Sequence, residues 1–130
     1  MDAKTSKINL LYVDQDHINR FAFHANFRRK YGQIFLTDNL EEAIRITNDY
    51  TIHVAFIDQR TLVESSFLNQ VFGVKPKLIV LSSGMYLEEL ELLPDWEKAF
   101  ECVTKPWKTG QVLDVVEKAC AAFGRLQELI

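Results

Sequence analysis

An apolar run that ends in a carboxylate constrains this chain most: Val54, Ala55, Phe56 and Ile57 lead directly into Asp58. Four apolar residues in a row lack the alternation of a strand with one wet face, and they favour a strand that is covered on both faces. Ligands of open α/β sheets bind at the carboxyl ends of the strands. Asp58 stands at such an end, so we take it as the centre of the candidate site.

Two other strand-like runs end in reactive groups, residues 8–13 before Asp14 and residues 77–81 before Ser82. We expect strands at residues 7–13, 33–37, 53–57, 77–81 and 100–104. Helical spacing lies between or after them, at about 17–31, from about 39, at 61–73, after 84 and from 109. Five strands that alternate with five helices imply a parallel sheet with right-handed crossovers and helices on both faces. The predicted fold class is doubly wound α/β.

The first helical stretch carries two apolar stripes, Ile18, Phe21, Ala22 and Ala25 on one and Phe23, Phe27 and Tyr31 on the other. We therefore expect this helix to be buried over a wide arc. Gly32 follows, and we expect it to end the helix in the left-handed backbone conformation.

Two further helices have clear signals. Asp38 or Asn39 can cap the second, because Glu41 and Glu42 stand three residues on, where capping-box partners belong. The last helix has a narrow apolar face at Val112, Val116, Ala119, Phe123 and Ile130.

The length and composition of the chain fit one compact domain with a hydrophobic core. At 130 residues, 48% hydrophobic and 25% charged, residues 1–130 should form a single domain. The net charge of -3 gives no general attraction to nucleic acid or to an anionic membrane. Arg28, Arg29 and Lys30 form a local basic cluster, which we interpret as a solvated helix face.

The cysteines and the apolar runs exclude several classes. Cys102 and Cys120 lack the spacing of a disulfide framework or a zinc site. Residues 1–7 have no apolar core of signal-peptide type, and no run approaches the length of a membrane span. We expect a cytoplasmic protein.

In the predicted sheet, the loops after four strands converge on one edge. They would bring together Asp14, Gln15, Asp16, Asp58, Ser82 and Lys105. Several carboxylates in one crevice repel one another, and a bound hard cation such as magnesium relieves that repulsion. A lysine and a hydroxyl opposite the cation could hold a phosphoryl group.

These motifs together resemble the receiver domains of two-component response regulators. The resemblance rests on residues 11–16, residues 56–58, Ser82 with Ser83, and residues 104–107, and it covers nearly the whole chain. Each motif alone is weak, but their order and spacing are fairly specific. The sequences of residues 58–60 and 104–107 also look like those of a bacterial subgroup of regulators that is often joined to output domains.

The resemblance implies a flavodoxin-like sheet with strand order 2-1-3-4-5 and a phosphoacceptor role for Asp58. The phosphoryl group would come from a histidine kinase or a phosphotransfer protein. Magnesium would be held by Asp14, Asp58 and the backbone carbonyl of Arg60. Ser82 would bond to a phosphoryl oxygen, and Lys105 would pair with its charge.

The sequence departs from the family pattern at three places. Gln15 stands where the family carries a second acidic residue that touches the metal. The loss of that anionic ligand could weaken a magnesium site by on the order of 1–3 kcal/mol. Asp16 is a doubtful substitute, one residue late. After Asp58 the usual Met-Pro pair is missing, and Cys102 occupies the place of an aromatic switch residue.

An enzyme gives the main alternative in another class. Asp14 and Asp16 resemble the Asp-x-Asp motif of haloacid dehalogenase-type phosphatases, with Asp14 as nucleophile and Asp16 as general acid and base. However, His17 and Ile18 follow instead of the usual Gly-Thr. Taken singly, Asp14 and Asp58 could also be helix caps, and Lys105 a surface lysine.

A third alternative is a degenerate receiver that acts as an interaction module without phosphate. Receivers commonly pair through the face of the fourth helix, fifth strand and fifth helix, here roughly residues 86–93, 100–103 and 109–123. A homodimer through that face is a hypothesis. The chain ends in helical character, so we expect that it is the N-terminal part of a longer regulator with an output domain.

Overall fold

The computed structural model describes residues 7–58, 61, 77–82, 101–104 and 107–129. Its five strands form one sheet in the order β2-β1-β3-β4-β5, and every neighbouring pair is parallel. The strands are β1 (Leu10–Val13), β2 (Ile34–Thr37), β3 (Val54–Asp58), β4 (Lys77–Ser82) and β5 (Glu101–Thr104). The predicted strand order is therefore confirmed.

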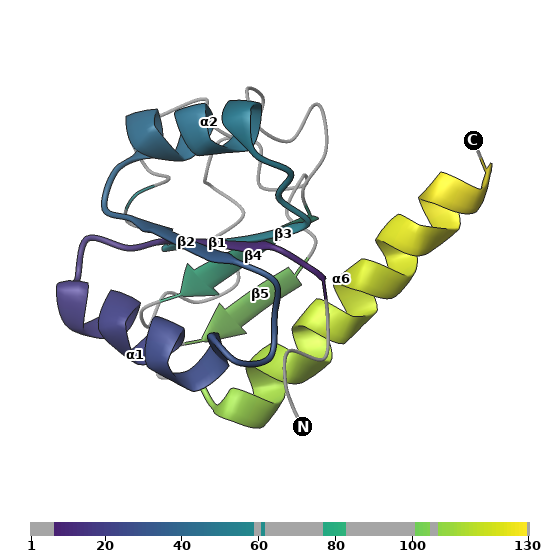
Figure 1. The fold of residues 1–130 in the computed structure, drawn as a ribbon. Helices are drawn as coiled ribbons and strands as arrows, with labels where there is room; N and C mark the ends of the chain where they lie inside the picture. The colour runs from purple at the N-terminus through teal and green to yellow at the C-terminus, as the bar shows by residue number, and fades with distance from the viewer. Residues whose placement is uncertain (1–6, 59–60, 62–76, 83–100, 105–106, 130) are drawn as a thin grey trace.

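Helices cover both faces of the sheet. Helix α1 (His17–Phe27) and helix α6 (Thr109–Leu129) lie on one face, and α2 (Leu40–Asp49) lies on the other (Figure 1). This arrangement confirms the doubly wound class. The helices expected after Thr61 and after residue 84 lie outside the described residues. No described helix is both long enough and apolar enough to cross a membrane.

The two central strands are completely buried, as their apolar runs predict. Every residue of β1 and of β3 is buried. Aromatic rings fill the space between them and α1: the ring centroid of Phe23 lies 4.3 Å from that of Tyr12 and 5.1 Å from that of Phe56. Trp107, just before α6, meets Phe23 edge-on at 5.7 Å. These rings join the sheet, α1 and α6 into one core.

The prediction that α1 is buried over a wide arc is wrong. Phe23 and Phe27 are buried, but Phe21 is 74% exposed and Ile18 is 64% exposed. A helix on a sheet face contacts it along one side only, and the stripe of Phe23 and Phe27 takes that side because its rings fit against the aromatic residues of β1 and β3. The second apolar stripe therefore faces outward.

Gly32 does not have the predicted left-handed conformation. Helix α1 ends earlier, with Arg28 as a right-handed C-cap, and the φ angle of Gly32 lies outside the left-handed region. A Cβ atom at Gly32 would stand 2.7 Å from Oδ1 of Asn9 and 3.1 Å from the carbonyl oxygen of Lys7. A side chain at position 32 would force Asn9 or the backbone of Lys7 to shift, because the turn passes so close to the start of β1.

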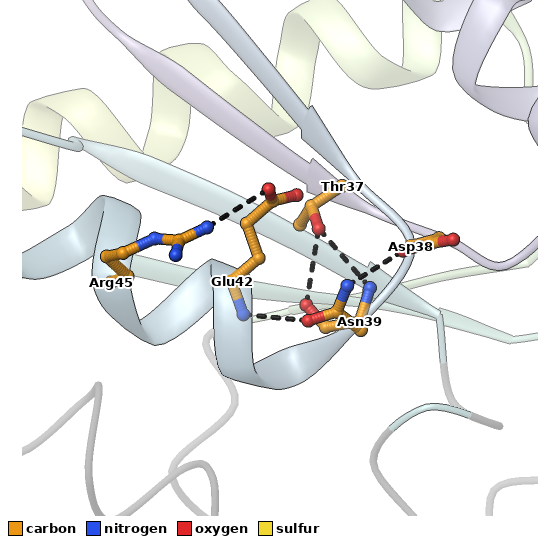
Figure 2. A network of polar contacts seen from close by, with 5 residues as sticks. All are labelled: Thr37, Asp38, Asn39, Glu42 and Arg45. Atoms are coloured by element: carbon orange, nitrogen blue, oxygen red, sulfur yellow. Dashed lines mark hydrogen bonds and ion pairs between the residues drawn. The ribbon is translucent and has the colours of Figure 1, made fainter.

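The N-cap of α2 is Asn39, one of the two predicted residues. Its Oδ1 accepts a hydrogen bond from the backbone N–H of Glu42 at 2.8 Å, and its own backbone N–H donates to Oγ1 of Thr37 at 3.3 Å (Figure 2). The Glu42 carboxylate in turn pairs with Arg45 at 3.2 Å. The end of β2 is thus tied to the first turn of α2.

The two faces of α1 predict opposite effects of removing a phenyl ring. Phe23→Ala should lower the free energy of unfolding by about 3–5 kcal/mol, because it opens a cavity in the aromatic core. Phe21→Ala, two residues away on the same helix, should change it by no more than about 0.5 kcal/mol. Urea unfolding followed by circular dichroism measures both. Equal losses would mean that Phe21 is buried.

Candidate functional site

Two carboxylates stand side by side where the central strands end. Val13 of β1 pairs with Ile57 of β3, so Asp14 and Asp58 occupy the next positions in register on strands about 4.8 Å apart. Both residues are 0% exposed. A buried carboxylate is costly unless it is hydrogen-bonded or paired. The site therefore depends on what compensates these two charges.

The protein supplies donors to both oxygens of Asp14. Oδ2 accepts hydrogen bonds from the hydroxyl of Tyr12 at 3.0 Å and from Nδ2 of Asn19 at 3.2 Å. Oδ1 accepts one from the backbone N–H of Asp16 at 3.0 Å. Arg20 donates to the backbone carbonyl of Asp14 at 2.7 Å. The side chain of Asp14 is thus held in one orientation by β1, the following loop and α1.

Tyr12 connects Asp14 to the start of α6. Its hydroxyl donates to Asp14 and accepts a hydrogen bond from Nε1 of Trp107 at 3.4 Å. Burial raises the pKa of Tyr12 well above its usual value, and the charges of Asp14 and Asp58 raise that pKa further. Tyr12 therefore stays protonated and remains a donor to the carboxylate.

The two residues after Asp14 differ in their contacts. The Asp16 side chain accepts a hydrogen bond from the backbone N–H of Ile18 at 2.9 Å, and it is the N-cap of α1. Its carboxylate is therefore engaged with the helix. Gln15 is exposed to solvent.

The other predicted site residues are placed only in part. Ser82 is the last residue of β4, one position beyond Leu81, which pairs with Asp58. Its backbone therefore ends the strand at the same edge of the sheet. Lys105 and Arg60 lie outside the described residues.

Sequence reasoning missed several residues around these carboxylates. Tyr12 could have been suspected, because residues two apart on a strand share a face. Asn19 and Arg20 carry no such signal, because whether their side chains reach Asp14 depends on the direction in which α1 runs from the loop. Thr61 is also buried, and its hydroxyl has no hydrogen-bond partner among the described residues.

The described residues supply part of a ligand set for a magnesium ion. No group of three or more His, Cys, Asp or Glu side chains that could hold a metal ion occurs among the residues described. Magnesium, however, is commonly bound by one or two carboxylates together with waters and phosphate oxygens. Asp14 and Asp58 supply those two carboxylates.

Two solved structures of receiver domains have a similar fold. The signal receiver domain of an HD domain-containing protein from Pseudomonas fluorescens matches with a TM-score of 0.79 at 10% identity, over 92% of this chain and 98% of that one. A response regulator receiver domain protein from Clostridium thermocellum matches with a TM-score of 0.76 at 18% identity, over 95% and 99%. The resemblance to receiver domains is confirmed at the level of the fold.

One curated protein is related in sequence as well. The hydrogenase transcriptional regulatory protein HoxA of Bradyrhizobium diazoefficiens is 25% identical over 123 residues, which are 92% of this chain. The chain spans 25% of the length of that relative. No protein-family model matches the sequence.

The hydrogen bond between Tyr12 and Asp14 predicts a measurable loss of stability. Tyr12→Phe should lower the free energy of unfolding by about 1.5–3 kcal/mol, the usual range for a hydrogen bond to a charged group. Tyr31→Phe is the matched control: Tyr31 is buried in the same core cluster, and the change should cost no more than about 0.5 kcal/mol. Equal losses in urea unfolding would contradict a special role for Tyr12.

The raised pKa of Tyr12 also predicts how stability depends on pH. A phenol whose pKa is higher in the folded than in the unfolded protein stabilises the fold fully below about pH 10, and this contribution is lost as the pH rises further. Burial raises the pKa of Tyr31 to about 12, with the same sign. The free energy of unfolding should therefore fall above about pH 10, less steeply in Tyr12→Phe. An unchanged slope in that variant would contradict the raised pKa.

Proposed function

We propose that this chain is a response regulator receiver domain that accepts a phosphoryl group on Asp58 from a histidine kinase or a phosphotransfer protein. One observation carries the proposal: Asp14 and Asp58 are fully buried at adjacent strand ends of a receiver-type sheet. Such burial is expensive for two acids. Two carboxylates side by side at the carboxyl ends of parallel strands are suited to a hard cation and to a phosphoryl group.

In the proposed reaction, a carboxylate oxygen of Asp58 attacks the phosphorus atom, and the bond from phosphorus to the donor breaks. Asp14, Asp58 and the carbonyl of Arg60 would hold a magnesium ion, which offsets the charge of the incoming phosphate. Ser82 would donate to a phosphoryl oxygen, and Lys105 would pair with the remaining charge. Asp58 is thus modified, and the domain is a phosphoacceptor rather than an independent enzyme.

The donors around Asp14 suit this role. Tyr12, Asn19 and the backbone of Asp16 hold its carboxylate in place before any ligand arrives, so little reorganisation is needed when the ligand binds. Tyr12 also touches Trp107 just before α6. A new dianion on Asp58 would act on this chain of contacts, which gives a route from the site to α6.

The phosphatase alternative is less well supported. It requires Asp14 as the nucleophile and Asp16 as the general acid and base. The oxygens of Asp14 accept three hydrogen bonds, and the carboxylate of Asp16 caps α1. Because the carboxylate of Asp16 caps α1, it is poorly placed to act as the general acid and base that the phosphatase reaction needs.

An interaction module without phosphate remains the second candidate because Gln15 brings no charge to the site. Its dimer face would include α6, whereas residues 86–93 lie outside the described part of the chain. The likeness to a quarter of a transcriptional regulator supports further domains in the full-length protein. In either case we place the domain in the cytoplasm, where kinase phosphate donors are found.

Phosphorylation should depend on Asp58 and on magnesium. With acetyl phosphate and magnesium, the intact mass should rise by one phosphoryl group, and neither Asp58→Asn nor the wild type with EDTA should gain it. Asp16→Asn is the control, since Asp16 belongs to the cap of α1 and should still permit labelling. Labelling of Asp58→Asn to the wild-type level would refute the assignment.

Restoring the missing charge should tighten magnesium binding. Gln15→Asp should lower the dissociation constant roughly 5- to 150-fold, the equivalent of 1–3 kcal/mol. The chain has two tryptophans, Trp96 and Trp107, so the fluorescence of Trp107 in a Trp96→Phe variant follows the titration. Gln111→Asp, an exposed glutamine on α6, controls for the added charge. An unchanged affinity in Gln15→Asp would show that Gln15 is not beside the metal.

A further inference from the structure

A basic hollow lies at the end of the sheet opposite Asp14 and Asp58. It has a volume of about 490 Å³ and is formed by the C-terminal half of α1, the following turn and the start of β2. Its lining includes His24, Arg28, Arg29, Gln33 and Phe35. Strand β1 pairs in parallel with both β2 and β3, so the start of β2 and the carboxyl ends of β1 and β3 lie at opposite ends of the strands. The hollow is therefore separate from the candidate phosphoacceptor site.

The charge of this hollow is opposite to that of the whole chain. The chain carries a net charge of -3, yet none of the described residues that line the hollow is acidic. Arg28 and Arg29 are exposed, and within the described residues neither guanidinium has an ion-pair partner. Arg45 of α2, in contrast, pairs with Glu42 at 3.2 Å. Arginines at the C-terminal end of a helix also complement the helix dipole. That effect explains the two charges but not the hollow beside them.

The second feature of the hollow is the open edge of β2. Among the described strands β2 is at the edge of the sheet and pairs with β1 alone. The carbonyls of Gln33 and Thr37 accept from the N–H groups of Leu10 and Asp14. Backbone groups alternate in direction along a strand, so those of Ile34 and Leu36 point away from β1. Such an edge is a template for an added strand.

We propose that this hollow and the edge of β2 bind an acidic, extended peptide segment of a partner protein. The segment adds as a strand beside β2 and bonds to the backbone of Ile34 and Leu36, while its carboxylates face Arg28 and Arg29. The rings of Phe35 and Tyr50, 4.7 Å apart, offer apolar contact on the α2 side. The proposal does not depend on phosphorylation of Asp58.

Charge and backbone together favour a peptide over a nucleic acid. Nucleic acids are bound by basic grooves that follow several phosphates, whereas the cations here stand at one end of a four-residue strand. A peptide uses both features at once, because side-chain carboxylates and backbone hydrogen bonds lie on the same segment.

Fluorescence anisotropy of the full chain with a fluorescein-labelled peptide of alternating Glu and Val tests the proposal. We expect binding that weakens with salt and that falls at least roughly tenfold in the double variant Arg28→Ala, Arg29→Ala. Arg45→Ala is the matched control on α2 and should bind as the wild type does. A peptide N-methylated at alternate residues should also lose binding, because it cannot pair with the strand edge.

Three outcomes would overturn the proposal. The peptide does not bind; the arginine double variant binds it as well as the wild type; or a single-stranded thymidine oligonucleotide binds more tightly with the same dependence on the arginines. Circular dichroism and acetyl phosphate labelling of Asp58 should be unchanged in the double variant. Those controls separate failure of this site from misfolding and from failure of the proposed phosphoacceptor role.

Discussion

The burial of two carboxylates at neighbouring strand ends is the constraint on which the rest of this structure depends. Asp14 and Asp58 are both inaccessible to solvent, and each must be compensated within the protein or by a ligand. For Asp14 the compensation comes from three segments: β1 gives Tyr12, the loop gives the N–H of Asp16, and α1 gives Asn19. Parallel strands, the loop and the first helix are therefore positioned around one charged group.

Much of this arrangement could be predicted because it follows from hydrophobic pattern. The unbroken apolar runs before Asp14 and Asp58 indicate strands buried on both faces, and alternation with helices then implies that both acids emerge at one edge. Asn39 was one of two candidate caps, and the structure selects it. The strand order came from the family resemblance rather than from the pattern.

The rest could not be predicted because it depends on packing. Both apolar stripes of α1 have helical spacing, and only the fit of Phe23 against Tyr12 decides which stripe is buried. The crowding around position 32 arises from a close approach to Asn9, which no local pattern reveals. The bond between Tyr12 and Trp107 joins residues 95 positions apart.

In this molecule α1 spans both proposed sites, with Asp16 at one end and Arg28 at the other.

A crystal structure of the protein with magnesium and beryllofluoride tests the central claim most directly, because beryllofluoride mimics a phosphoryl group on an aspartate. We expect the beryllium atom on a carboxylate oxygen of Asp58, with the metal between Asp58 and Asp14 and with Tyr12 still bonded to Asp14. An adduct on Asp14, or an unmodified Asp58 at saturating beryllofluoride and magnesium, would contradict the claim that these buried acids form a phosphoacceptor site.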